Sequence, residues 1–201
     1  MTTRIIGSCA ALLVFAAIGI GAAATDVADA VEHGDTTALR KLLAQKADVN
    51  AAQPDGGTAL HWAVYRDDLA SVDLLLKAGA NVKAANQYGA TPLSLAAESG
   101  KAAMVQRLLD AGADPNERML NKETVLMMAA RTGDVATMKL LLDRGADVNA
   151  KETLRGTTAL MWAAAQKHPA AVKLLVERGA DVSAASDPAW QDRPVRYAKA
   201  T

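Results

Sequence analysis

The stretch TALHWAV, residues 58–64, returns almost unchanged as TALMWAA at residues 158–164. Its opening threonine has two further counterparts, and the four positions are spaced by 33, 33 and 34 residues: Thr58, Thr91, Thr124 and Thr158. Four glycines keep the same three spacings: Gly79, Gly112, Gly145 and Gly179. Two independent landmarks with one period indicate a tandem repeat, and an earlier copy has Lys46 in place of the glycine.

Each unit has the pattern of two short antiparallel helices. The threonine hydroxyl is suited to accept a hydrogen bond from an unpaired amide at the start of the first helix. The apolar stripe of this helix begins two residues later, at Leu60, Leu93, Leu126 and Leu160. The glycine ends the second helix, where a left-handed residue costs least without a Cβ. A unit of this size cannot bury its own apolar face, so the units must stack.

The tetrapeptide Thr58-Ala59-Leu60-His61 and its copies resemble the Thr-Pro-Leu-His sequence of ankyrin repeats. Residues 145–149, Gly-Ala-Asp-Val-Asn, are similar to that family's junction between helix and hairpin. The resemblance covers about residues 25–186 and implies an all-α ankyrin-repeat solenoid of stacked helix-turn-helix units with β-hairpin fingers. The expected units are an N-terminal cap at 25–53 and repeats at 54–85, 86–118, 119–151 and 152–186.

The chain departs from the family pattern at the fourth residue of the tetrapeptide. His61 alone keeps the histidine, whose imidazole in the family bridges backbone groups within and between repeats. Ser94, Met127 and Met161 replace it elsewhere. We expect those junctions to lose a polar contact and to gain apolar contact.

Residues 1–24 have the layout of a secretory signal peptide. Arg4 precedes an apolar stretch that ends in Ala22, Ala23 and Ala24, a small-residue cleavage site before Thr25. The alternative is an uncleaved membrane anchor, because Ile5 to Ala24 is about the length that crosses a bilayer. Cys9, the only cysteine, precedes the apolar stretch rather than following it, which does not fit the acylation site of bacterial lipoproteins. We expect an exported protein, periplasmic or secreted, without disulfides.

Residues 187–201 contain Trp190, Val195 and Tyr197 and form either a tail or the start of a further repeat. No polar capping unit follows the last apolar helix, at Leu174 and Leu175. The tail folds back over this helix, or the chain is the first part of a longer array; the pattern favours the second interpretation.

The composition and the motifs indicate no catalytic or cofactor chemistry. Lys and Arg together number 22, as do Asp and Glu, so no electrostatic signature of nucleic-acid binding is present. His33, His61 and His168 fall in different units, separated by about 10 Å per packed layer, too far apart to share a metal ion. Asp67 and Asp68 are explained by helix capping. We expect no enzyme, no cofactor and no metal.

The ankyrin family binds partners through its fingers and first helices, and the equivalent positions here vary freely from copy to copy, whereas the core positions change little. Any one of these residues is explained as ordinary solvated surface, but as a set they favour a protein-binding face, in which aromatic and arginine residues are the best anchors. The set comprises Tyr65, Arg66, Gln87, Tyr88, Glu98, Arg118, Leu120, Arg131, Lys151, Leu154 and Gln166.

The sequence therefore predicts a non-catalytic module that binds a protein partner, with no nucleic-acid ligand. Two other hypotheses stay open. In one, an enzymatic or ligand-binding domain follows Thr201. In the other, an uncleaved leader makes the protein a scaffold at the membrane.

Overall fold

The structure is a computed structural model, which describes residues 26–120 and 122–186. The expected leader with Cys9, the tail with Trp190 and position 121 lie outside the described residues. Within them the chain forms five consecutive helix pairs: α1 (Asp26–Glu32) with α2 (Thr36–Ala44), α3 (Ala59–Tyr65) with α4 (Leu69–Lys77), α5 (Pro92–Glu98) with α6 (Ala102–Asp110), α7 (Val125–Thr132) with α8 (Val135–Asp143), and α9 (Ala159–Ala165) with α10 (Pro169–Glu177). We call these pairs units 1 to 5.

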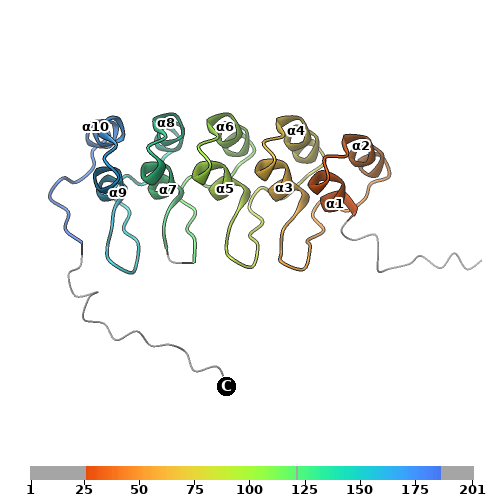
Figure 1. Cartoon of the computed structure of the whole chain (residues 1–201), viewed down its shortest axis with the longest axis horizontal. Coiled ribbons are helices and arrows are strands. Elements are labelled where there is room, and N and C mark those ends of the chain that lie inside the picture. The colour runs from red at the N-terminus through yellow and green to blue at the C-terminus, as the bar shows by residue number, and fades with distance from the viewer. Residues whose placement is uncertain (1–25, 121, 187–201) are drawn as a thin grey trace, which may run out of the picture.

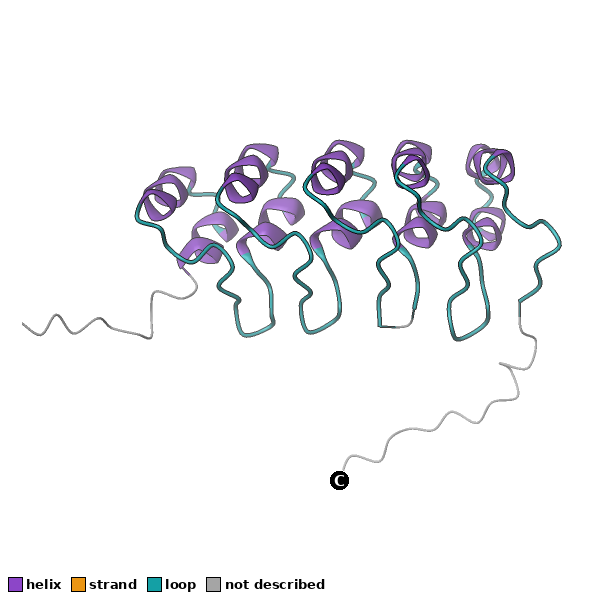
Figure 2. Ribbon diagram, turned by 180° about the vertical axis from the view of Figure 1, so that it is seen from behind, coloured by secondary structure: helices purple, strands orange, loops and turns teal. Residues whose placement is uncertain are grey.

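The units stack side by side into an elongated slab (Figure 1). The first helices α1, α3, α5, α7 and α9 form one row, each in contact with the next, and the second helices form a parallel row. The loops that join the units all project from the same side of the slab, beyond the row of first helices (Figure 2). The expected all-α solenoid is confirmed.

One apolar core runs through all five units. Leu60, Leu93 and Leu126 are buried at equivalent positions of successive first helices, and Leu75 and Leu108 are buried in the second helices. Burial decreases at the last unit, since no further unit follows within the described part of the chain. Leu160, the counterpart of Leu60, is only partly buried there. Leu174 and Leu175 are nevertheless buried, although the sequence suggested that they lack a cover.

The repeated threonines lie at the starts of first helices. Thr91, Thr124 and Thr158 have extended backbone angles, and each hydroxyl accepts a hydrogen bond from the amide three residues ahead. At α3 the N–H of Thr58 donates to Nδ1 of His61 at 3.1 Å. Gly112 follows α6 at a φ of +92°, the left-handed conformation that a Cβ disfavours. Lys46 adopts the same conformation, at +58°, after α2.

The projecting loops are fingers of hairpin shape, but no strand is assigned in the described residues. Each finger has only a short stem, and one isolated bridge, between Arg118 and Thr124, is present. Single closing bonds do not make a ladder, so the stems are shorter than an ordinary strand. We define the fingers as residues 53–57, 86–90, 119–123 and 152–157.

Candidate protein-binding surface

Backbone hydrogen bonds close the base of every finger. The N–H of Gln53 donates to the carbonyl of Gly57 at 2.8 Å, and the N–H of Asn86 donates to that of Ala90 at 2.9 Å. The fourth finger is one residue longer, and in it the N–H of Glu152 donates to the carbonyl of Thr157 at 3.1 Å. The first two fingers are also linked, since the N–H of Gln87 donates to the carbonyl of Asp55 at 2.8 Å. These bonds fix the loop backbones in a defined shape.

Side chains at the finger bases stabilise the tips. Oδ1 of Asn86 accepts from the amides of Tyr88 and Ala90, at 3.0 and 2.9 Å. The carboxylate of Glu152 has the same role in the fourth finger, where it accepts from the amides of residues 154, 155 and 157. Burial opposes ionisation of Glu152, but these amides outweigh it and hold the pKa of Glu152 below its ordinary value. Pre-formed tips reduce the entropy that binding would cost.

Four large apolar side chains of the predicted set are exposed on the finger side of the slab. Tyr65 at the end of α3 is 70% exposed, Tyr88 65%, Leu120 75% and Leu154 57%. The rings of Tyr65 and Trp62 are nearly perpendicular, with centroids 5.8 Å apart. Large apolar side chains in a shared exposed location are typical of interaction sites rather than of solvated surface.

Beside these side chains lie three hollows, one at each junction between units 2 and 5. We call them the first, second and third junction hollows, with volumes of about 230, 340 and 240 Å³. Each lies between two neighbouring fingers and the first helices behind them. Trp62 and Leu95 line the first hollow, Met128 the second and Trp162 the third, at equivalent positions of successive helices. Tyr65, Leu120 and Leu154 line the first, second and third hollows, respectively.

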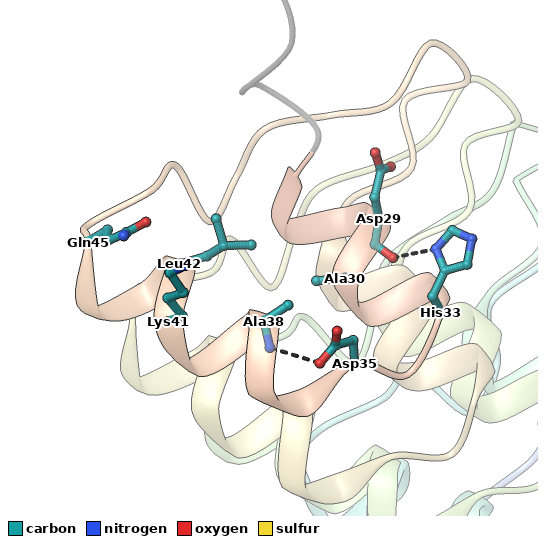
Figure 3. Close-up of a pocket in the computed structure, with 8 residues that line it drawn as sticks. All are labelled: Asp29, Ala30, His33, Asp35, Ala38, Lys41, Leu42 and Gln45. Atoms are coloured by element: carbon teal, nitrogen blue, oxygen red, sulfur yellow. Dashed lines mark hydrogen bonds between the residues drawn. The ribbon is translucent and has the colours of Figure 1, made fainter.

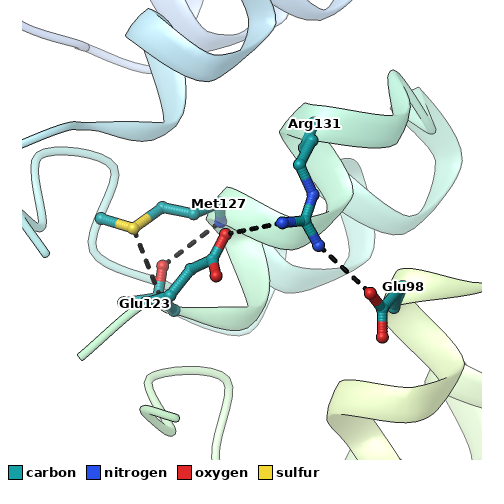
Figure 4. A network of polar contacts seen from close by, with 5 residues as sticks. Glu98, Glu123, Met127 and Arg131 are labelled. Carbon is teal, nitrogen blue, oxygen red and sulfur yellow. Dashed lines mark hydrogen bonds and ion pairs between the residues drawn. The ribbon is translucent and has the colours of Figure 1, made fainter. Parts of the chain in front are cut away.

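Arg131 lies between the second and third hollows and lines both. Its guanidinium forms ion pairs with Glu98 of α5 at 3.2 Å and with the largely buried Glu123 at 3.6 Å (Figure 4). It also lies over the ring of Trp162, 5.8 Å from the centroid. Arg131 therefore connects three consecutive units, and its substitution would leave the carboxylate of Glu123 without this ion pair in a buried place.

Two other predicted arginines are also engaged within the chain. Nη1 of Arg66 donates to the carbonyl of Glu32 in unit 1 at 3.0 Å. Nη1 of Arg118 donates to the carbonyls of Lys122 and Lys151, at 3.2 and 3.1 Å, and so connects the third finger to the residue that precedes the fourth. The sequence suggested Arg118 and Arg131 as anchors for a partner, whereas the structure uses both to hold neighbouring units together.

The remaining predicted residues lie at the edges of the face. Gln87 is exposed on the second finger, and Lys151 is exposed directly before the fourth finger. Gln166 is exposed at the end of α9. Four residues that line the hollows from the first helices were not part of the predicted set, although their repeat spacing was visible in the sequence: Trp62, Leu95, Met128 and Trp162. The structure therefore favours the exposed apolar side chains of the predicted set, rather than its arginines, as contacts for a partner.

Among the described residues, no group of three or more His, Cys, Asp or Glu side chains is arranged to hold a metal ion. A further hollow, of about 520 Å³, lies on α1 and α2 (Figure 3). Its acids have structural roles, since Asp35 accepts from the amide of Ala38 at 2.8 Å and Asp29 accepts from Gln53 at 2.9 Å. None of the helices described is long and apolar enough to span a bilayer.

A model of ankyrin repeats, built on three copies, matches residues 27–119 and again residues 112–186. The chain belongs to the ankyrin repeat family. Ankyrin repeats are generally protein–protein interaction modules and are typically not enzymes. A comparison with curated proteins found no match.

One ankyrin histidine is kept, and it connects two units as the family pattern implies. Nδ1 of His61 accepts from Thr58, so Nε2 carries the proton and donates to the carbonyl of Ala90 at 3.0 Å. Burial lowers the pKa of His61 and outweighs these contacts, which favours the neutral imidazole. His61 is therefore a structural residue.

At Ser94 the expected loss of a polar contact is wrong. The carboxylate of Glu117, from the loop before the third finger, reaches back to unit 3 and accepts from the hydroxyl of Thr91 and from the backbone amide of Ser94. Glu117 is the only acid at this position of the repeat; the equivalent residues of the other copies are Ala51, Ala84, Ala150 and Ala184. At the junction with Ser94, the polar contact comes from the long side chain of Glu117. At the junction with His61, the residue equivalent to Glu117 is Ala84, and the imidazole itself makes the contact.

His168 also connects two units. It precedes α10, and its Nε2 lies 3.1 Å from the carbonyl of Arg131 in the preceding unit. Lys101, at the same position before α6, donates to the carbonyls of Val64 and Tyr65, both at 3.0 Å. Both side chains satisfy carbonyls at the end of the neighbouring first helix, which have no partner inside that helix.

Proposed function

We propose that this ankyrin repeat protein is an exported, non-catalytic module that binds a protein partner through its junction hollows and finger tips. The observation that carries this proposal is the row of three hollows edged by Tyr65, Tyr88, Leu120 and Leu154. Burial of a large apolar side chain contributes about 1.5–3 kcal/mol. A partner that covers this row can therefore gain affinity where the chain otherwise leaves apolar surface in water.

The proposal is tested by capture of partners from the native envelope with the tagged protein. Tyr88 and Leu120 both line the second hollow and have no role in the core, so the double variant Tyr88→Ala, Leu120→Ala is expected to fold and to lose the partner. The matched control is Val176→Ala with Val182→Ala, which removes two exposed apolar side chains near the C-terminal end of the array. Equal capture by both variants, with unchanged circular dichroism, would place the binding surface elsewhere. Arg131→Ala is unsuitable, because it disturbs the ion pairs with Glu98 and Glu123.

The proposed export rests on the sequence of residues 1–24. We expect cleavage before Thr25, which intact-mass measurement of the exported protein would detect as the loss of 24 residues. Recovery of the full-length mass in the membrane fraction would instead favour an anchored scaffold.

A further inference from the structure

The three junction hollows recur once per unit and form a continuous row. Glu123 and Arg131 line both the second and the third hollow, and the second finger borders both the first and the second. Because the hollows lie between successive first helices, their spacing follows the distance between packed helices, about 8–10 Å. The row therefore has a fixed repeat length, which a bound chain must match to use every hollow.

An extended chain matches this spacing with every third residue. In polyproline II geometry three residues span about 9 Å and complete one turn, so every third side chain lies on the same face. In a strand, by contrast, every third side chain alternates between the two faces. A helical partner is a poorer match, since its turns rise about 5.4 Å and alternate turns would meet the ridges between hollows. The hollows, at about 230–340 Å³, are also at or below the small end of ligand pockets, which suits one side chain each.

The charges along the row favour a basic partner. Four acids line the hollows, Asp55, Glu98, Glu123 and Glu152, against two arginines, Arg131 and Arg155, which leaves two negative charges in excess. The whole chain is balanced at 22 acids and 22 bases, so this excess is local. Lysine or arginine side chains between the apolar ones of a bound segment would lie near these carboxylates.

We infer that the partner presents an extended segment with an apolar side chain at every third residue and basic residues between them. This inference rests on the proposed function and specifies the chemistry of the partner. Each apolar side chain enters one hollow, against Trp62 in the first, Met128 in the second and Trp162 in the third. The basic side chains stay near the rims, where salt screens their contribution.

Labelled peptides of one composition test the spacing. Each contains three leucines, with lysine and glycine filling the other positions, and the leucines stand at every third, every second or every seventh residue. Fluorescence anisotropy is expected to show at least tenfold tighter binding of the every-third peptide. The Tyr88→Ala, Leu120→Ala protein should lose this preference, while Val182→Ala should keep it. A fourth peptide, with glutamate in place of lysine at the same leucine spacing, is expected to bind at least tenfold more weakly.

Equal affinities for all spacings, tighter binding of the every-seventh peptide, or no binding of any peptide would each overturn the inference. Preference for the glutamate peptide would do so as well. These outcomes are separable from failure of the proposed function. An envelope protein that is lost with the Tyr88→Ala, Leu120→Ala variant would uphold a binding face on these hollows, even if every extended peptide failed to bind.

Discussion

Replacing Glu117 with glutamine is expected to remove a pH dependence of stability between about pH 4.5 and 7. Burial at the junction of units 3 and 4 raises the pKa of Glu117 from 4.5 to about 7, and Asp114 adds to the rise. The hydrogen bonds from Thr91 and Ser94 oppose the rise only in part. The groups that hold the carboxyl, at the start of α5, are thus the Thr91 hydroxyl and the Ser94 amide. The neighbouring Arg118 is directed toward the carbonyls of Lys122 and Lys151.

The sign follows from proton binding in the two states. Between about pH 4.5 and 7 the folded chain holds a proton on Glu117 and the unfolded chain does not, so the free energy of unfolding falls as the pH rises. At about 1.4 kcal/mol for each pH unit, the loss is at most about 3 kcal/mol by pH 7.5. Partial access of solvent to the side chain reduces this figure.

Urea denaturation of the parent and of Glu117→Gln, at steps from pH 4 to 8, measures the effect. His61 contributes an opposite slope below about pH 6.5, because its lowered pKa favours folding of the neutral form as the pH rises. The difference between parent and variant cancels this contribution. We expect that difference to change by about 1–3 kcal/mol across the range, with glutamine the more stable at pH 7.5. A constant difference would refute the burial of Glu117 at this junction.

Three further predictions concern the array itself. Leu108→Ala should lower the free energy of unfolding by about 2–5 kcal/mol in urea titration, because the side chain is fully buried; a change below about 0.5 kcal/mol would contradict its core position. A Cβ at position 112 would meet no neighbour, so Gly112→Ala should cost only the strain of the positive φ, about 1–2 kcal/mol. Lys46 has a positive φ as well, so Lys46→Gly should relieve strain and stabilise by up to about 1 kcal/mol. In thermal melts, Gly112→Ala should lower the melting temperature and Lys46→Gly should raise it; shifts in the same direction would contradict a left-handed conformation at both positions. Lys83→Asn should add about 1 kcal/mol, with Lys83→Ala as control, because asparagine at this position in other units bonds the next unit's loop; equal melting of the two variants would exclude that bond.

The helices and their ends could be predicted from the sequence because they depend on local chemistry repeated at one period. Thr158 and Gly112 act within their own units, so a single copy contains the information. The identical period also implies stacking, since no unit can cover its own apolar face. The residues that line the hollows from the first helices could also have been predicted, because Trp62 and Trp162 stand at equivalent positions of the repeat.

The contacts between units could not be predicted in the same way. Arg66, Arg118 and Arg131 each have a long side chain with several carbonyls or carboxylates within reach, and only the folded array decides among them. The contact of Glu117 with Thr91 joins residues 26 apart in the sequence. Such pairs become visible only when equivalent positions of neighbouring units are compared together.

Hydrogen exchange with a captured partner bound tests the central claim most directly. The account predicts slower exchange at the finger amides of residues 86–90 and 119–123 when the partner is present. The amides of α6 and α8, in the opposite row, should exchange as in the free protein. Protection confined to α4, α6 and α8, with unchanged fingers, would contradict a binding face built from the junction hollows.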